Sequence, residues 1–138
     1  MNLVEKYVKD EGFYKYMYRC DFSELLNQTV IEVYQSDEVV QLRTATHIFE
    51  LSHDQDCCES VVIEDICGDL NDLLNNPILL AEESTSNENP LYEDEDSFTW
   101  TFYKLATIRG YVDIRWYGSS NGYYSESATC YKIPYGVE

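Results

Sequence analysis

The strongest constraint on this fold is a strict alternation of side chains between residues 98 and 117. Large apolar residues occupy every second position on both sides of a turn signal at Arg109-Gly110, namely Phe98, Trp100, Phe102, Val112, Ile114 and Trp116. Because successive side chains of a strand point to opposite faces, a period of two predicts adjacent antiparallel strands. Asn121-Gly122 matches a type I′ hairpin turn, so we expect a third strand from Tyr123 to Ile133 and an antiparallel meander.

The remaining chain contains further strands and a few short helices. Segments with the composition of strands span residues 29–34, 39–43, 46–53, 61–66 and 78–83. Helical spacing or capping residues occur in residues 3–17, 21–26 and 68–74. Strands do not alternate with long helices, as they would in a parallel sheet. We therefore expect an α+β fold, with a twisted antiparallel sheet of about six to eight strands and one or two short helices on one side.

The length of 138 residues predicts a single domain over residues 1–138. We expect residues 1–21 to form a helical N-terminal extension and the polar residues 84–97 to form an acidic surface loop. No apolar run is long enough to span a bilayer, and the first residues lack the apolar segment of a secretory signal.

The cysteines argue against a disulfide framework. Five is an odd number, and Cys57 directly precedes Cys58, a spacing at which disulfides seldom form. We therefore expect reduced thiols and a cytoplasmic location. In particular, we expect no bond between Cys57 and Cys58 and none between Cys20 and Cys130.

The net charge of −17 is concentrated in one block of the chain. Residues 44–103 contain fifteen Asp and Glu but no Lys or Arg, so the rest contributes only −2. Such a field repels nucleic acid and anionic membranes, and it attracts basic protein grooves or metal cations. Solubility alone is the competing explanation, but the segregation of the charge argues against it. We expect a protein partner to contact the acidic run Glu93, Asp94, Glu95 and Asp96.

A histidine and several cysteines predict a structural zinc site. His53, Cys57 and Cys58 lie within six residues, and Cys67 is the expected fourth ligand, with Cys20 as the alternative. The spacing differs from the diagnostic pair of cysteines separated by two residues. The competing interpretation is that the cysteines have packing roles and that His53 hydrogen-bonds a neighbouring carboxylate.

The same region carries a weaker indication of catalysis. His53 and a nearby thiol could form a base and a nucleophile, and Asp54, Asp56 and Glu59 could hold Mg²⁺. The surrounding carboxylates would raise the pKa of a thiol, and no basic residue lies nearby in the sequence to bind a phosphate. We therefore rank an enzyme, dependent on a metal or a cysteine, third among the functions considered and expect no catalytic residues.

The segment from Arg115 to Glu126 is rich in tyrosine. One interpretation is a hairpin with aromatic cross-strand pairs. The other is an exposed platform that anchors a protein partner, because Tyr, Trp and Arg are frequent at interface hot spots. For the second interpretation, Tyr117, Tyr123 and Tyr124 are the expected contact residues.

Three stretches together resemble a family of small acidic bacteriophage proteins of unassigned domain function. They are His53–Glu59 (HDQDCCE), Ile63–Leu70 (IEDICGDL) and Trp116–Glu126 (WYGSSNGYYSE), and the resemblance covers about residues 22–130. It implies an extension over residues 1–21, supplies no catalytic residues and favours a structural metal.

Small acidic phage proteins of this kind include inhibitors of CRISPR nucleases. The resemblance therefore implies a counter-defence protein in the host cytoplasm, which binds an RNA-guided nuclease through its acidic surface and blocks DNA loading. Direct binding to nucleic acid or to a membrane is not expected. A zinc-stabilised structural or interaction domain without inhibitory role is the alternative.

Overall fold

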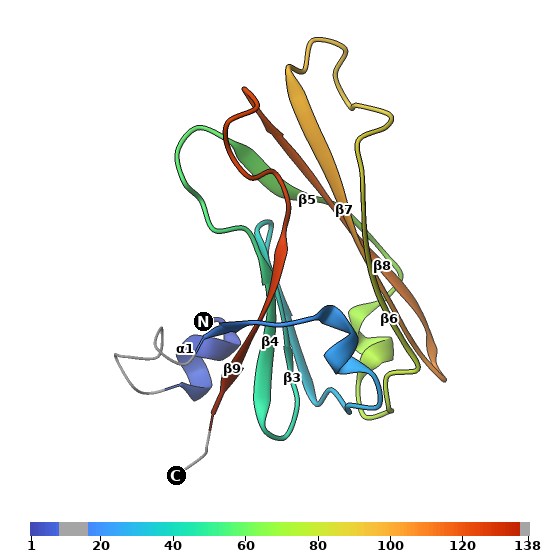
Figure 1. The fold of residues 1–138 in the computed structure, drawn as a ribbon. Coiled ribbons are helices and arrows are strands. Elements are labelled where there is room, and N and C mark those ends of the chain that lie inside the picture. Colours follow the sequence, from blue (N-terminus) through green and yellow to red (C-terminus); the bar gives the residue numbers. More distant parts are fainter. Residues whose placement is uncertain (9–16, 136–138) are drawn as a thin grey trace.

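Two antiparallel sheets make up most of the protein. The computed structural model describes residues 1–8 and 17–135. The first sheet has the strand order β1 (Tyr18–Arg19), β9 (Thr129–Pro134), β4 (His47–Ser52), β3 (Val39–Arg43) and β2 (Glu32–Gln35). The second has the order β5 (Ser60–Cys67), β8 (Gly110–Ser120), β7 (Ser97–Thr107) and β6 (Leu80–Ser86). Figure 1 shows them as two layers.

The core lies between the two sheets. Leu42 and Leu51 from the first sheet belong to the same buried cluster as Leu105, Ile114 and Trp116 from the second. All five side chains are fully buried. Because large apolar side chains from both layers interdigitate there, burial of apolar surface holds the sheets face to face.

The alternation between residues 98 and 117 forms the longest hairpin, as predicted. β7 and β8 pair over eleven residues each, from Ser97 opposite Ser120 to Thr107 opposite Gly110. Val112, Ile114 and Trp116 face the core, whereas Phe98, Trp100 and Phe102 lie on the other face of the sheet.

The predicted hairpin at Asn121-Gly122 is wrong. β8 ends at Ser120, and β9 pairs with β4, with Ile133 opposite Ile48 and Cys130 opposite Leu51. The chain turns back over β8 instead of continuing beside it. A Cβ atom on Gly118 would overlap the backbone carbonyl of Glu126, so glycine permits this close crossing. The chain then passes from the second sheet to the first.

The prediction of an antiparallel, β-rich fold is confirmed, but the finer prediction of an α+β fold is not. The described residues form two sheets, and their helical content is limited to α1 (Leu3–Tyr7) and the 3-10 turns η2 (Phe22–Leu25) and η3 (Leu70–Leu73). Both turns place apolar residues three positions apart because these side chains fill the core, Phe22 and Leu25 in η2 and Leu70 and Leu73 in η3. Asn27 and Asn75 adopt positive φ angles of 66° and 64° just after the turns, which prevents longer helices.

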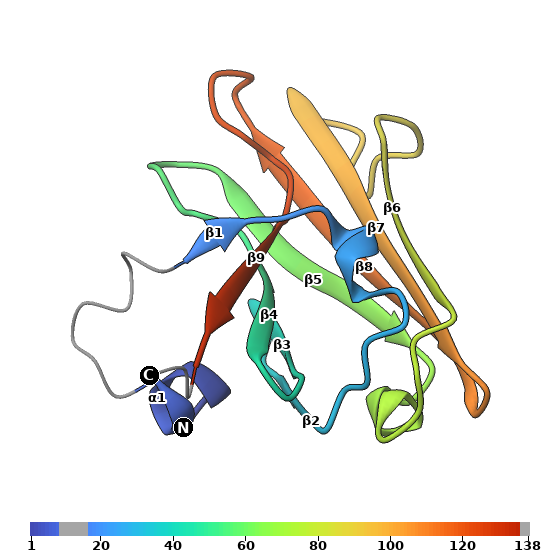
Figure 2. The ribbon, with the colours of Figure 1, turned by 60° about the horizontal axis from the view of Figure 1, so that its bottom comes forward.

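The N-terminal residues pack on the first sheet. Leu3 and Val4 of α1 are buried against Ile48 and Ile133, and β1 pairs with β9 (Figure 2). The predicted helix over residues 3–17 is present at Leu3–Tyr7, and its part over residues 9–16 lies outside the described residues. Within the described ranges, no helix is long and apolar enough to cross a bilayer.

Candidate functional site

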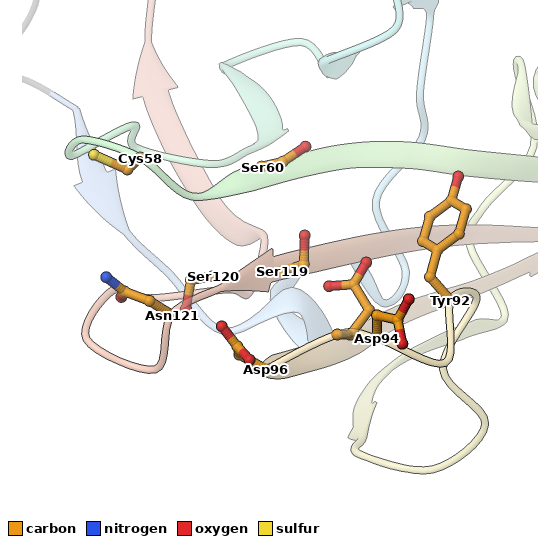
Figure 3. A pocket seen from close by; sticks show the side chains of 9 residues that line it. Cys58, Ser60, Tyr92, Asp94, Asp96, Ser119, Ser120 and Asn121 are labelled. Atoms are coloured by element: carbon orange, nitrogen blue, oxygen red, sulfur yellow. The ribbon is translucent and has the colours of Figure 1, made fainter.

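Three loops gather at one end of the molecule, the upper end in Figure 1. They are residues 53–59 after β4, residues 87–96 after β6 and residues 121–128 after β8. They and the adjoining strand ends form an open pocket of about 370 Å³, which we call the loop-end pocket, lined by Cys58, Ser60, Tyr92, Asp94, Glu95, Asp96, Ser119, Ser120 and Asn121. Figure 3 shows that these side chains come from three separate segments of the chain.

The first loop is built around the buried carboxylate of Glu59. Its oxygens accept hydrogen bonds from the backbone amides of Asp56 (2.9 Å) and Cys57 (2.8 Å) and from the Gln55 side chain (3.1 Å). The His53 Nε2 atom lies 2.8 Å away. Burial alone would raise the pKa of the Glu59 carboxyl, but the hydrogen bonds from the Cys57 and Asp56 amides and from His53 lower it to about 2. Glu59 therefore holds the loop as a carboxylate.

A second buried carboxylate, that of Glu126, organises the third loop. It accepts hydrogen bonds from the hydroxyls of Ser97 (3.1 Å), Thr99 (3.0 Å) and Ser120 (2.5 Å). These donors come from the start of β7 and the end of β8, so Glu126 ties the loop to both strands. Each glutamate is the last residue of a stretch that carries the family resemblance, and in both cases its role is to shape a loop.

Cys57 and Cys58 are joined by a disulfide. The expectation that these adjacent thiols stay free is therefore wrong. The two cysteines are direct neighbours with Cα atoms 3.7 Å apart, in a loop whose Asp56 and Cys57 amides are held by the Glu59 carboxylate, so the two sulfurs lie within bonding reach. Cys20, Cys67 and Cys130 are free, as expected.

The structure does not bring the predicted zinc ligands together. The ring nitrogens of His53 face acceptor oxygens, on Glu59 at 2.8 Å and on the Ser127 carbonyl at 3.0 Å. Cys67 lies at the far end of the eight-residue strand β5, about 23 Å along it from Ser60 at 3.3 Å per residue. Within residues 1–8 and 17–135, no three His, Cys, Asp or Glu side chains are grouped to hold a metal.

The contact between His53 and Glu59 is the alternative that the sequence offered for this histidine. Cys57 and Cys58 offer no thiolate to a metal while they are bonded to each other. Zinc binding by the reduced protein stays a prediction, which elemental analysis would test.

The predicted acidic contact residues lie at the loop-end pocket. Asp94, Glu95 and Asp96 line it, and the adjacent Glu93 is exposed. Among the described residues, every ion pair involves other acids, so these four carry no salt bridge. The charge of these four residues is therefore not offset by an ion pair within the described part of the chain.

The three predicted tyrosines differ in their exposure. Tyr123 is 87% exposed and Tyr124 is partly exposed. Tyr117 is only 5% exposed, because its ring packs on Phe98 and Trp100 and its hydroxyl accepts a hydrogen bond from the Leu91 amide. The prediction that Tyr117 belongs to an exposed tyrosine platform is therefore wrong. Tyr92, which is 65% exposed and lines the loop-end pocket, was missed because it falls in the polar loop.

A model of a protein family described as "Domain of unknown function (DUF7448)" matches residues 23–130, which is most of the chain. The protein belongs to DUF7448. The DUF7448 match extends from the turn η2 to Cys130 in β9, so it contains the whole loop-end pocket and excludes β1. It confirms, over residues 23–130, the predicted resemblance to a domain family without assigned function. No curated protein and no solved structure matches the chain.

Proposed function

We propose that this DUF7448 protein is a binding protein that docks its acidic loop end onto a basic groove of a protein partner, without catalysing a reaction. The observation that carries the proposal is the loop-end pocket, where Asp94, Glu95 and Asp96 remain without a cationic partner in the described structure. Uncompensated charge of one sign accelerates association with a surface of the opposite sign.

The architecture of the loops supports this role. Glu59 and Glu126 fix the first and third loops through hydrogen bonds. The second loop, which carries the acids, is anchored by hydrogen bonds between Asn89 and Trp100 and between Leu91 and Tyr117. A binding surface that is already ordered loses less conformational entropy on association. Exposed Tyr92 and Tyr123 at the same end would add apolar contact area beside the acids.

We further propose that the partner is a host RNA-guided nuclease and that the protein acts in phage counter-defence. The resemblance to small acidic phage proteins motivates this choice of target. Such nucleases hold the guide–target heteroduplex in a positively charged channel, mainly through its backbone. An acidic protein that occupies the channel competes with DNA for the same Lys and Arg side chains, so it would block DNA loading.

Charge reversal tests the acidic surface. In one variant Asp94, Glu95 and Asp96 become Lys, and in the matched control Asp37, Glu38 and Glu82, exposed residues that do not line the pocket, become Lys. Binding to guide-loaded nucleases is measured at several salt concentrations. We expect the first variant to slow association at least tenfold and to weaken its salt dependence, and the control to change it less than threefold.

Equal losses in the two variants would show that the acids act only through net charge, which would contradict docking at the loop end. The target is tested separately by DNA binding and cleavage assays with a panel of RNA-guided nucleases. Inhibition that needs stoichiometric protein supports the proposed mechanism. Inhibition at strongly substoichiometric protein would instead indicate an enzyme. A panel in which no nuclease is bound would refute the target.

A further inference from the structure

Cys20 and Cys130 lie in contact although 110 positions separate them in the chain. Their Sγ atoms are 3.2 Å apart, and the Cys20 amide donates a hydrogen bond of 3.0 Å to the Cys130 carbonyl. The backbone contact continues the pairing of β1 with β9, in which Arg19 lies opposite Tyr131. The sheet itself therefore holds the two thiols together.

The two thiols differ in access. Cys130 is 2% exposed and belongs to the core, whereas Cys20 is partly exposed. Both line an open groove of about 480 Å³ together with Arg19, Asp21, Glu24, Glu83, Ala128 and Thr129. The hydrogen bond from Cys130 lowers the pKa of the Cys20 thiol, while the same contact and burial raise the pKa of Cys130. A reagent in solution therefore meets the more acidic thiol first.

We propose that Cys20 and Cys130 form a redox modification site, at which a low-molecular-weight disulfide converts the two thiols into an intramolecular disulfide. In the first step the Cys20 thiolate attacks one sulfur of the reagent, the sulfur–sulfur bond of the reagent breaks, and one reagent thiolate leaves. In the second step Cys130 attacks the Cys20 Sγ, and the second reagent thiolate leaves. The two leaving thiolates take up the two cysteine protons, so the protein loses two electrons and the reagent gains them.

The new bond would join a residue outside the family match to a residue inside it. Cys20 precedes the matched residues 23–130, and Cys130 is the last of them. Oxidation would therefore fasten the N-terminal segment to β9 covalently. A loop of this length loses much conformational freedom when it is closed in the unfolded chain, so the oxidised protein should unfold at a higher temperature, by about 10 °C.

The charges around the groove predict which reagent reacts fastest. Asp21, Glu24 and Glu83 face it, and Lys132, which lies 2.7 Å from Glu24, is already paired. Among the described residues that line the groove, Arg19 is the one base, so this described lining is net acidic. We expect cationic cystamine to react faster than neutral hydroxyethyl disulfide, and anionic glutathione disulfide to react slowest.

Trypsin digestion allows a direct measurement on the full chain. Cleavage after Lys and Arg leaves Cys20 in residues 20–43 and Cys130 in residues 116–132, while the other three cysteines share residues 44–104. After treatment with each disulfide and blocking of free thiols, mass spectrometry should show residues 20–43 linked to residues 116–132. Cys20→Ser tests the site, and Cys67→Ser is the control because Cys67 is an exposed free thiol.

We expect the linked peptide and the higher melting temperature in the wild-type protein and in Cys67→Ser, and neither in Cys20→Ser. The wild-type protein alone can overturn the proposal. It would do so if the folded protein gave only a mixed disulfide on Cys20, or no reaction at Cys20. A rise in melting temperature that persists in Cys20→Ser would assign the effect to other cysteines and would also overturn it.

Discussion

Replacing Glu126 by Gln should destabilise the protein strongly although the two side chains have nearly the same size. The carboxylate accepts from the Ser97, Thr99 and Ser120 hydroxyls, and the residue is 8% exposed. A hydrogen bond to a charged group contributes about 1.5–3 kcal/mol. The amide keeps one accepting oxygen and presents a donor to the remaining hydroxyls. We therefore expect a loss of about 2–4 kcal/mol in the free energy of unfolding, and a melting temperature lower by about 10 °C.

Urea unfolding followed by tryptophan fluorescence measures this loss, because Trp116 and Trp100 are both buried. Glu93→Gln is the matched control, since Glu93 is exposed and should change stability by less than about 0.5 kcal/mol. A double-mutant cycle with Ser120→Ala should give a coupling energy above about 1 kcal/mol. If Glu126→Gln were as stable as Glu93→Gln, the assignment of Glu126 as the organiser of the third loop would be refuted.

Two further predictions concern the same loops. The Glu59 carboxyl has a pKa of about 2 in the folded protein, below its ordinary value, so its contribution to stability is complete above about pH 4.5 and is lost as the pH falls towards 2. In this pH window, the urea midpoint of Glu59→Gln should therefore depend less on pH than the midpoint of the wild-type protein. Parallel curves for the two proteins would contradict this prediction. Gly118→Ala should lower the free energy of unfolding by about 2–4 kcal/mol, because the added Cβ would overlap the Glu126 carbonyl. Gly122→Ala should lower it less in thermal unfolding, because the added atom meets open space there, although φ is +97°.

Most strands could be predicted from the sequence because a half-buried strand alternates locally. Residues 39–43 form β3 with the predicted bounds, and the alternation after Phe98 marks the β7–β8 hairpin. The partner of β9 could not be predicted in this way. Asn121-Gly122 is a local turn signal, whereas the pairing of β9 with β4 depends on contacts between distant residues. The division into two sheets follows from that choice of partner.

The acidic character of the candidate site could be predicted from the sequence, but the burial of its individual side chains could not. A run of acids without bases is visible in any sequence, so Asp94, Glu95 and Asp96 could be selected. The burial of Glu59 could not, because a carboxylate becomes buried only where a folded loop supplies its donors. Tyr117 was misjudged for a related reason. Residues of the polar loop cover the outer aromatic face, where Asn89 accepts a hydrogen bond from Trp100 and the Leu91 amide donates to Tyr117.

The position of β9 has a practical consequence for protein production. An expressed fragment trimmed to the family match, residues 23–130, would keep only Thr129 and Cys130 of β9. Most of the edge of β4 would then lose its hydrogen-bonding partner, and Ile48 would lose its neighbours Leu3 and Ile133. An unpaired strand edge next to exposed apolar side chains is a template for aggregation. We therefore expect a stably folded fragment to extend beyond the matched residues and to include α1, β1 and the whole of β9.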